Sequence, residues 1–130
     1  IRQADKVVCV SLTGNEIVTF QSGTYTKFAF VVPTLLINGY IYQDNSNQPL
    51  DCSTFSANQQ ILTDTNLITG VSINTLGGVF NVNNQAGFGD IVTIKFNVSP
   101  GLGIASSFNN QIDPITFQTT VSLRGYTEIR

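Results

Sequence analysis

The chain has 130 residues, enough for one compact domain, and only 11% of them are charged, with a net charge of −2. Six Lys and Arg residues give no basic footprint for nucleic acid, and the absence of His excludes imidazole catalysis and the commonest zinc sites. The hydrophobic fraction of 42% is sufficient for a core, so the low charge does not indicate disorder.

Apolar and polar residues alternate through most of the chain, whereas no segment shows a capped helical repeat. Turn-forming residues such as Gly77-Gly78 and Pro100-Gly101 separate the alternating segments. The predicted strands, in chain order, are 6–12, 16–21, 25–32, 34–43, 60–62, 67–73, 79–82, 90–98 and 115–124. We therefore predict an all-β fold in one domain, 1–130, built as a β-sandwich or jelly roll of about eight to nine strands.

The first and last predicted strands are candidate surfaces for assembly. The last one contains no charge before Arg124 and no Pro after Pro114, although monomeric proteins usually protect an edge strand with Lys, Pro or a bulge. This strand therefore lies either inside a sheet or at an edge that a neighbouring subunit completes by β-augmentation. The candidate assembly residues are Lys6, Val8, Val10 and Leu12 in the first strand and Ile115, Phe117, Thr119, Val121 and Leu123 in the last.

The two cysteines, Cys9 and Cys52, have none of the short spacings of metal or redox sites. Three states are open to them: two buried reduced thiols, a disulfide within the chain, or a disulfide between subunits. Either disulfide would place the protein in an oxidising compartment.

The residues that could carry catalysis or ligand binding are few. Glu16, Asp90 and Asp113 could in principle supply the paired carboxylates of a glycosidase, but nothing in the sequence brings them together. We expect no enzyme activity, no cofactor and no metal. Tyr40 and Tyr42 share one strand face, and such a pair either stacks on a sugar or, more commonly, covers the rim of a core.

The ends and apolar runs of the chain bear on its location. The sequence contains no Met, which favours a cleaved or excised N-terminus at Ile1. The longest apolar runs are far too short for a membrane span. Together with the neutral polar composition, these features lead us to expect an extracellular protein on the surface of a cell, spore or virion.

The segment Gln3-Ala4-Asp5-Lys6-Val7-Val8-Cys9-Val10 resembles the first strand of bacterial endospore appendage subunits, and 88–94 and 117–124 are similar to later strands of that family. The resemblance implies a small jelly roll that assembles into a fibre by lateral pairing of sheet edges. It also implies that disulfides join neighbouring subunits, with Cys9 receiving a neighbour's N-terminal connector. Here no Cys precedes Cys9, so a Cys9–Cys52 bond within one subunit is at least as plausible.

Three functions follow as hypotheses. The first is a structural, self-assembling subunit of an extracellular fibre or surface layer, a homopolymer held by β-augmentation. The second is a viral capsid, tail or decoration protein with a jelly-roll fold. The third is a glycan-binding module that uses Tyr40 and Tyr42.

Overall fold

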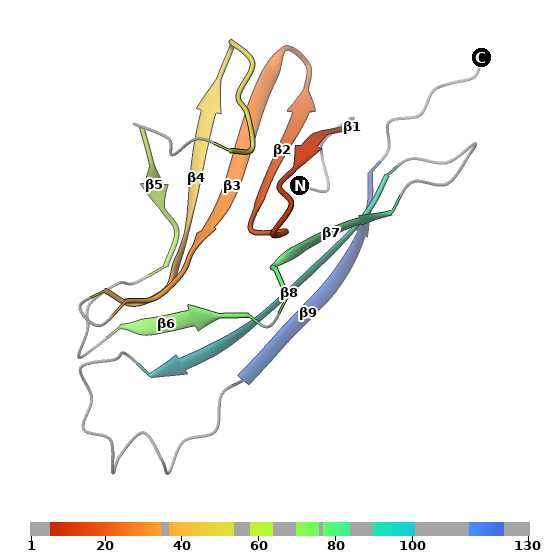
Figure 1. The fold of residues 1–130 in the computed structure, drawn as a ribbon. Coiled ribbons are helices and arrows are strands. Elements are labelled where there is room, and N and C mark those ends of the chain that lie inside the picture. The colour runs from red at the N-terminus through yellow and green to blue at the C-terminus, as the bar shows by residue number, and fades with distance from the viewer. Residues whose placement is uncertain are drawn as a thin grey trace.

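The computed structural model describes residues 6–34, 37–53, 58–63, 70–75, 77–83, 90–100 and 115–123. Within these ranges the chain forms nine strands in two antiparallel sheets and no helix, so no helix there could cross a membrane (Figure 1). The predicted all-β sandwich of eight to nine strands is confirmed. The strands are β1 Lys6–Val10, β2 Glu16–Gln21, β3 Thr24–Val31, β4 Tyr40–Ser46, β5 Gln60–Ile61, β6 Val71–Asn74, β7 Phe80–Asn83, β8 Ile91–Pro100 and β9 Ile115–Ser122.

The first sheet is a meander in the order β1-β2-β3-β4-β5. β2 and β3 form a tight hairpin in which Gln21 pairs with Thr24, and the two connecting residues, Ser22 and Gly23, both have positive φ. Positive φ angles at both connecting residues are what a two-residue hairpin turn needs in order to match the right-handed twist of its strands. All five strands precede the second sheet in sequence, so the order differs from the two Greek keys of a jelly roll.

The second sheet is built around β8, its longest strand. β9 runs along one side of β8, while β6 and β7 share the other side, pairing with the end and the beginning of β8 respectively. Figure 1 shows β8 and β9 as a long pair that crosses beneath the first sheet.

The core lies between the two sheets. Ile17 and Phe30 point into it from the first sheet, and Ile73, Phe80 and Val92 meet them from the second. These positions follow the period of two along each strand, which places alternate side chains on one face.

One predicted strand is displaced along the chain. The pattern predicts a strand over 34–43, whereas β4 begins at Tyr40 and continues to Ser46. Thr34 N–H donates to Ile37 O, and Ile37 N–H donates to Thr34 Oγ1, so these residues form a turn where the prediction has a strand. The first strand is shorter than predicted, because it ends at Val10 and leaves Leu12 in the following turn. The start of the predicted strand 67–73 lies outside the described residues, and β6 covers Val71–Asn74.

Candidate assembly site

The outer side of β9 is an open sheet edge in the described part of the chain. β9 pairs with β8 through eight consecutive residue pairs, from Ile115 opposite Val98 to Ser122 opposite Ile91, with no bulge. No other described strand pairs with β9. Two large apolar side chains on this strand are exposed: Ile115 retains 71% of its accessible surface and Phe117 retains 46%.

The register determines which backbone groups of β9 face outward. Leu123 N–H donates to Asp90 O, so the odd-numbered residues of β9 exchange hydrogen bonds with β8. Lys95 N–H donates to Val79 O on the opposite side of β8, which agrees with this alternation. The N–H and C=O groups directed away from β8 therefore belong to Thr116, Gln118, Thr120 and Ser122.

The two faces of β9 differ in chemistry. The face directed towards the first sheet carries the apolar residues, and there the Phe117 ring stacks on the Phe96 ring with centroids 5.0 Å apart. The other face carries hydroxyl and amide groups: Thr116 Oγ1 donates to Asn97 Oδ1 at 2.9 Å, and Thr120 Oγ1 lies 3.4 Å from that of Thr93. A strand added to β9 would meet an apolar row on one face and a neutral polar row on the other.

The outer edge of β1, the other predicted assembly edge, is protected. The pairing of β1 with β2 is interrupted at Val8, between Val7 and Cys9. The N–H of Val7 donates to Asp90 Oδ2 at 2.9 Å, and Asp90 directly precedes β8 of the second sheet. A bulge and a carboxylate cap are two of the means by which proteins prevent edge pairing.

The predicted assembly residues of β1 are nevertheless exposed at their side chains. Lys6 lies with its Nζ 5.6 Å from the centroid of the Phe20 ring, and Val8 and Val10 are 39% and 38% exposed. Leu12 is fully exposed in the turn after β1 and borders a hollow of about 500 Å³ beside the Asp51–Ser53 segment.

The remaining described edges are short or covered. β5 has two residues. The free side of β6 is occupied because Ile73 N–H donates to Gly39 O. The free side of β7 is occupied at Phe80, whose N–H donates to Gly14 O at 2.7 Å. Of the described edges, β9 is therefore the long one that remains open.

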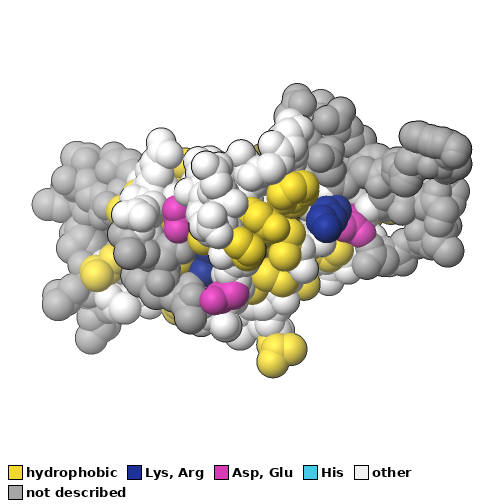
Figure 2. Space-filling view, turned by 90° about the horizontal axis from the view of Figure 1, so that it is seen from above, with side chains coloured by type: hydrophobic (Ala, Val, Ile, Leu, Met, Phe, Trp, Pro, Cys, Tyr) yellow, Lys and Arg dark blue, Asp and Glu magenta, His cyan; other side chains and the backbone are white. Residues whose placement is uncertain are grey.

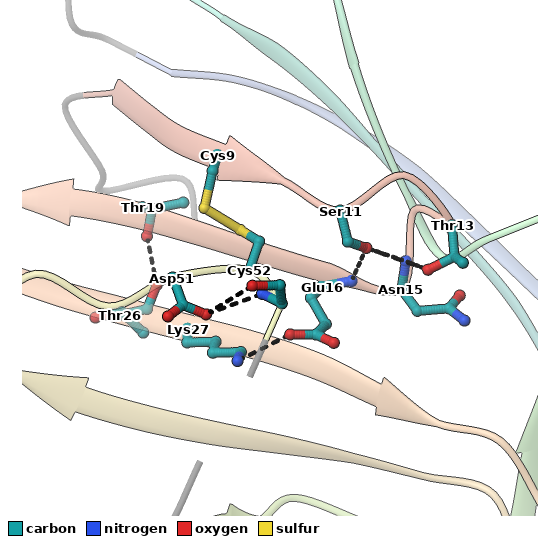
Figure 3. The surroundings of a disulfide bond; sticks show 11 residues. Cys9, Ser11, Thr13, Asn15, Glu16, Thr19, Thr26, Lys27, Asp51 and Cys52 are labelled. Carbon is teal, nitrogen blue, oxygen red and sulfur yellow. Dashed lines mark hydrogen bonds and ion pairs between the residues drawn. A yellow bond between two sulfur atoms is a disulfide. The ribbon is translucent and has the colours of Figure 1, made fainter. Parts of the chain in front are cut away.

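The cysteines form a disulfide within the chain. Cys9 on β1 is bonded to Cys52, which follows β4, and their Cα atoms are 6.2 Å apart (Figure 3). Among the three states that the sequence leaves open, the structure shows the intrachain bond. Because Cys9 is engaged in this way, it does not bear the cross-link to a neighbour that the endospore appendage resemblance implies.

The disulfide lies over the face of the first sheet that points away from the core. On that face Val18, Lys27 and Tyr42 are at most 1% exposed. Lys27 Nζ forms an ion pair with Glu16 Oε1 at 2.8 Å, close to Cys52 and Asp51 in Figure 3. The disulfide thus holds the segment around Cys52 close to the buried residues on the outer face of the first sheet.

The two tyrosines do not form an exposed platform. Tyr42 is 1% exposed, and Tyr40 is half-buried with its hydroxyl donating to Gln59 Oε1 at 3.4 Å. Asn38, which the sequence places near them, is fully buried. The strand alternation correctly puts the rings on one face, but the sequence does not reveal that this face is covered.

Two of the three candidate carboxylates make structural contacts. Glu16 pairs with Lys27, Asp90 caps the edge of β1, and Asp113 lies outside the described residues. No group of three or more His, Cys, Asp or Glu side chains that could hold a metal is found in the described ranges. Figure 2 shows few charged side chains on one face of the molecule, with hydrophobic ones gathered near its centre.

The roles of Asp90, Gly14, Gly39 and Gln118 at the edges were missed by the sequence reasoning. Each depends on register or on contacts between distant segments, and the alternating pattern of a single strand carries no such signal. No protein-family model, no curated protein and no solved structure matches the chain.

Proposed function

We propose that the chain is a structural subunit that assembles with copies of itself by β-strand augmentation at β9, as part of an extracellular fibre or surface layer. The observation that carries this proposal is that, in the described part of the chain, β9 has an open, uncharged edge while β1, β6 and β7 are protected. The intrachain disulfide supports an oxidising location, where such bonds persist.

The contrast between the edges is the physical argument. A monomeric protein gains by covering every long edge, because unpaired N–H and C=O groups act as a template for another strand. Here β1, β6 and β7 each have an outward N–H bonded to a carboxylate or carbonyl group, whereas no described strand pairs with the outer side of β9. An added strand would satisfy the outward N–H and C=O groups of β9 and cover Ile115 and Phe117.

The experiment uses proline to remove one outward N–H. Gln118→Pro deletes a donor that faces away from β8, a position where an edge strand tolerates Pro. We expect the unaltered chain to form filaments or layers in non-reducing negative-stain electron microscopy. We expect Gln118→Pro to lose the pairing at β9 and to form neither filaments nor layers, while keeping its cooperative unfolding transition.

The matched control is Gln118→Ala, which shortens the same side chain and keeps the N–H. This variant should assemble like the unaltered chain. Thr119→Pro is unsuitable, because the N–H of Thr119 faces β8 and its loss disrupts the subunit itself. A monomeric unaltered chain, or a Gln118→Pro variant that assembles normally, would contradict the proposal. Closed shells in place of filaments would assign the same edge to a capsid-like assembly.

A further inference from the structure

We infer that the strand which pairs with β9 is β9 of a second copy, antiparallel and related to the first by a two-fold axis at Thr119. This inference rests on the proposed function and names the partner of the same edge. In the described part of the chain, the other edges are short, bulged or already bonded to Asp90, Gly14 or Gly39. Of the described strands, β9 of a second copy is therefore the one that is both long enough and free to pair with β9 of the first.

The hydrogen-bonding pattern selects the register. Two edge strands join through the residues whose backbone groups point outward, here Thr116, Gln118, Thr120 and Ser122. A two-fold axis at Thr119 sets Thr116 opposite Ser122 of the second copy and Gln118 opposite its Thr120, so all four outward residues find partners. With the axis at Gln118, Ser122 has no opposite residue within β9, and with the axis at Thr120 the same holds for Thr116.

The side chains agree with this register. Residues directly opposite each other in an antiparallel pair share one face of the sheet. The apolar row of β9 therefore meets the apolar row of the second copy, with Ile115 opposite Leu123 and Phe117 opposite Val121. The polar row meets the polar row, and no charged side chain stands in either one. The contact is self-complementary, as a two-fold interface requires.

The consequence is one continuous sheet through two copies. The exposed Ile115 and Phe117 then lie beside a neighbouring strand instead of water. Because an isologous contact closes on itself, it produces a dimer, and a longer assembly of such dimers needs a second contact on another surface.

The test is a cysteine placed on the proposed axis. In this register Thr119 stands opposite Thr119 of the second copy as a non-hydrogen-bonded pair, whose Cα atoms lie about 4.5 Å apart. That separation is within the span of a disulfide. The native cysteines are already bonded to each other, so Thr119→Cys introduces a single free thiol. We expect mild oxidation to convert most of this variant into a covalent dimer on a non-reducing gel.

The matched control is Gln118→Cys, whose thiol lies one residue away on the polar face. Two copies of Cys at this position are diagonal neighbours about 7–8 Å apart, beyond the reach of a disulfide. We expect at least ten-fold less covalent dimer from it than from Thr119→Cys. An equimolar mixture of Gln118→Cys and Thr120→Cys should form the mixed dimer, since these positions face each other.

The outcomes separate this inference from the proposed function. If the chain assembles and Gln118→Pro abolishes assembly, but Thr119→Cys does not cross-link, then another strand pairs with β9 and the two-fold register is overturned. If the unaltered chain stays monomeric at all concentrations, the proposed function falls as well. Cross-linking of Thr119→Cys with a cooperative unfolding transition supports both.

Discussion

At the scale of single residues, the ion pair of Lys27 and Glu16 is an unusual feature of so weakly charged a chain. Lys27 is 1% exposed at its side chain, whereas Glu16 is 26% exposed, although the Oε1 atom that pairs with Lys27 is buried. The two partners therefore differ in what their loss leaves behind. A buried ammonium that loses its carboxylate costs more than a carboxylate that water can solvate.

This asymmetry predicts the order of two substitutions. Glu16→Gln should lower the free energy of unfolding by about 1–3 kcal/mol, because it removes the Glu16 carboxylate from the buried charge of Lys27. Lys27→Met should lower it by less, since a similar apolar volume fills the same space. Urea denaturation of both variants, with the exposed Lys95→Met as control, measures the difference. A larger loss for Lys27→Met than for Glu16→Gln would contradict the argument.

At the scale of secondary-structure elements, the alternating pattern was enough to place segments of all nine strands. It works because a half-buried strand has a side-chain period of two, which is local information. It failed at residues 34–39, where the apolar run resembles a strand but the backbone turns at Thr34 and Ile37. Just after that turn, Gly39 O accepts from Ile73 N–H in β6, which lies more than thirty residues further along the chain.

The candidate assembly site was also predicted only in part from the sequence. The sequence singled out both terminal strands, since each is short of charge, and both are edges in the structure. It did not distinguish them, because the protection of β1 comes from Asp90, a residue distant in sequence. The burial of Tyr42 was missed for a similar reason, because a single strand pattern does not show that its outward face is covered.

The backbone at Gly39 lies in close contact with β6. A Cβ on Gly39 would overlap Ile73 O and lie 3.0 Å from the Pro33 Cδ atom. Gly39 N–H also donates to Ser72 Oγ, and its carbonyl accepts from Ile73 N–H, so its backbone joins the two sheets.

Gly39→Ala should therefore be severely destabilising, by about 3 kcal/mol or more, as expected when a rigid backbone must move. Gly23→Ala is the control, because a Cβ there meets open space and the cost is limited to about 1 kcal/mol of positive-φ strain. Thermal unfolding of the two variants provides the comparison. Equal stability of the two variants would show that the backbone around Gly39 and Ile73 can move apart at little cost, and would contradict the prediction.

At the scale of the whole molecule, the disulfide and the outer edge of β9 belong to different sheets. The disulfide joins β1 to the segment after β4 and acts on the first sheet. Among the described strands, the open edge belongs to β9, in the second sheet, which Figure 1 shows beneath the first sheet that contains β1. Subunit stability and subunit pairing should therefore respond to different changes.

This separation gives the last prediction. Replacing both cysteines, Cys9→Ser with Cys52→Ser, opens a loop with a sequence separation of 43. The chain-entropy model assigns such a loop about 4 kcal/mol of stabilisation, so the urea midpoint should fall markedly. Below that midpoint, the folded fraction should still pair through β9, because none of the β9 contacts involves the bond. Light scattering at matched folded concentrations measures this, with Gln118→Pro as the variant expected to lose β9 pairing while keeping the disulfide. Loss of assembly in the folded double-serine variant would show that the pairing surface includes the first sheet, and would move the interface from β9 towards β1.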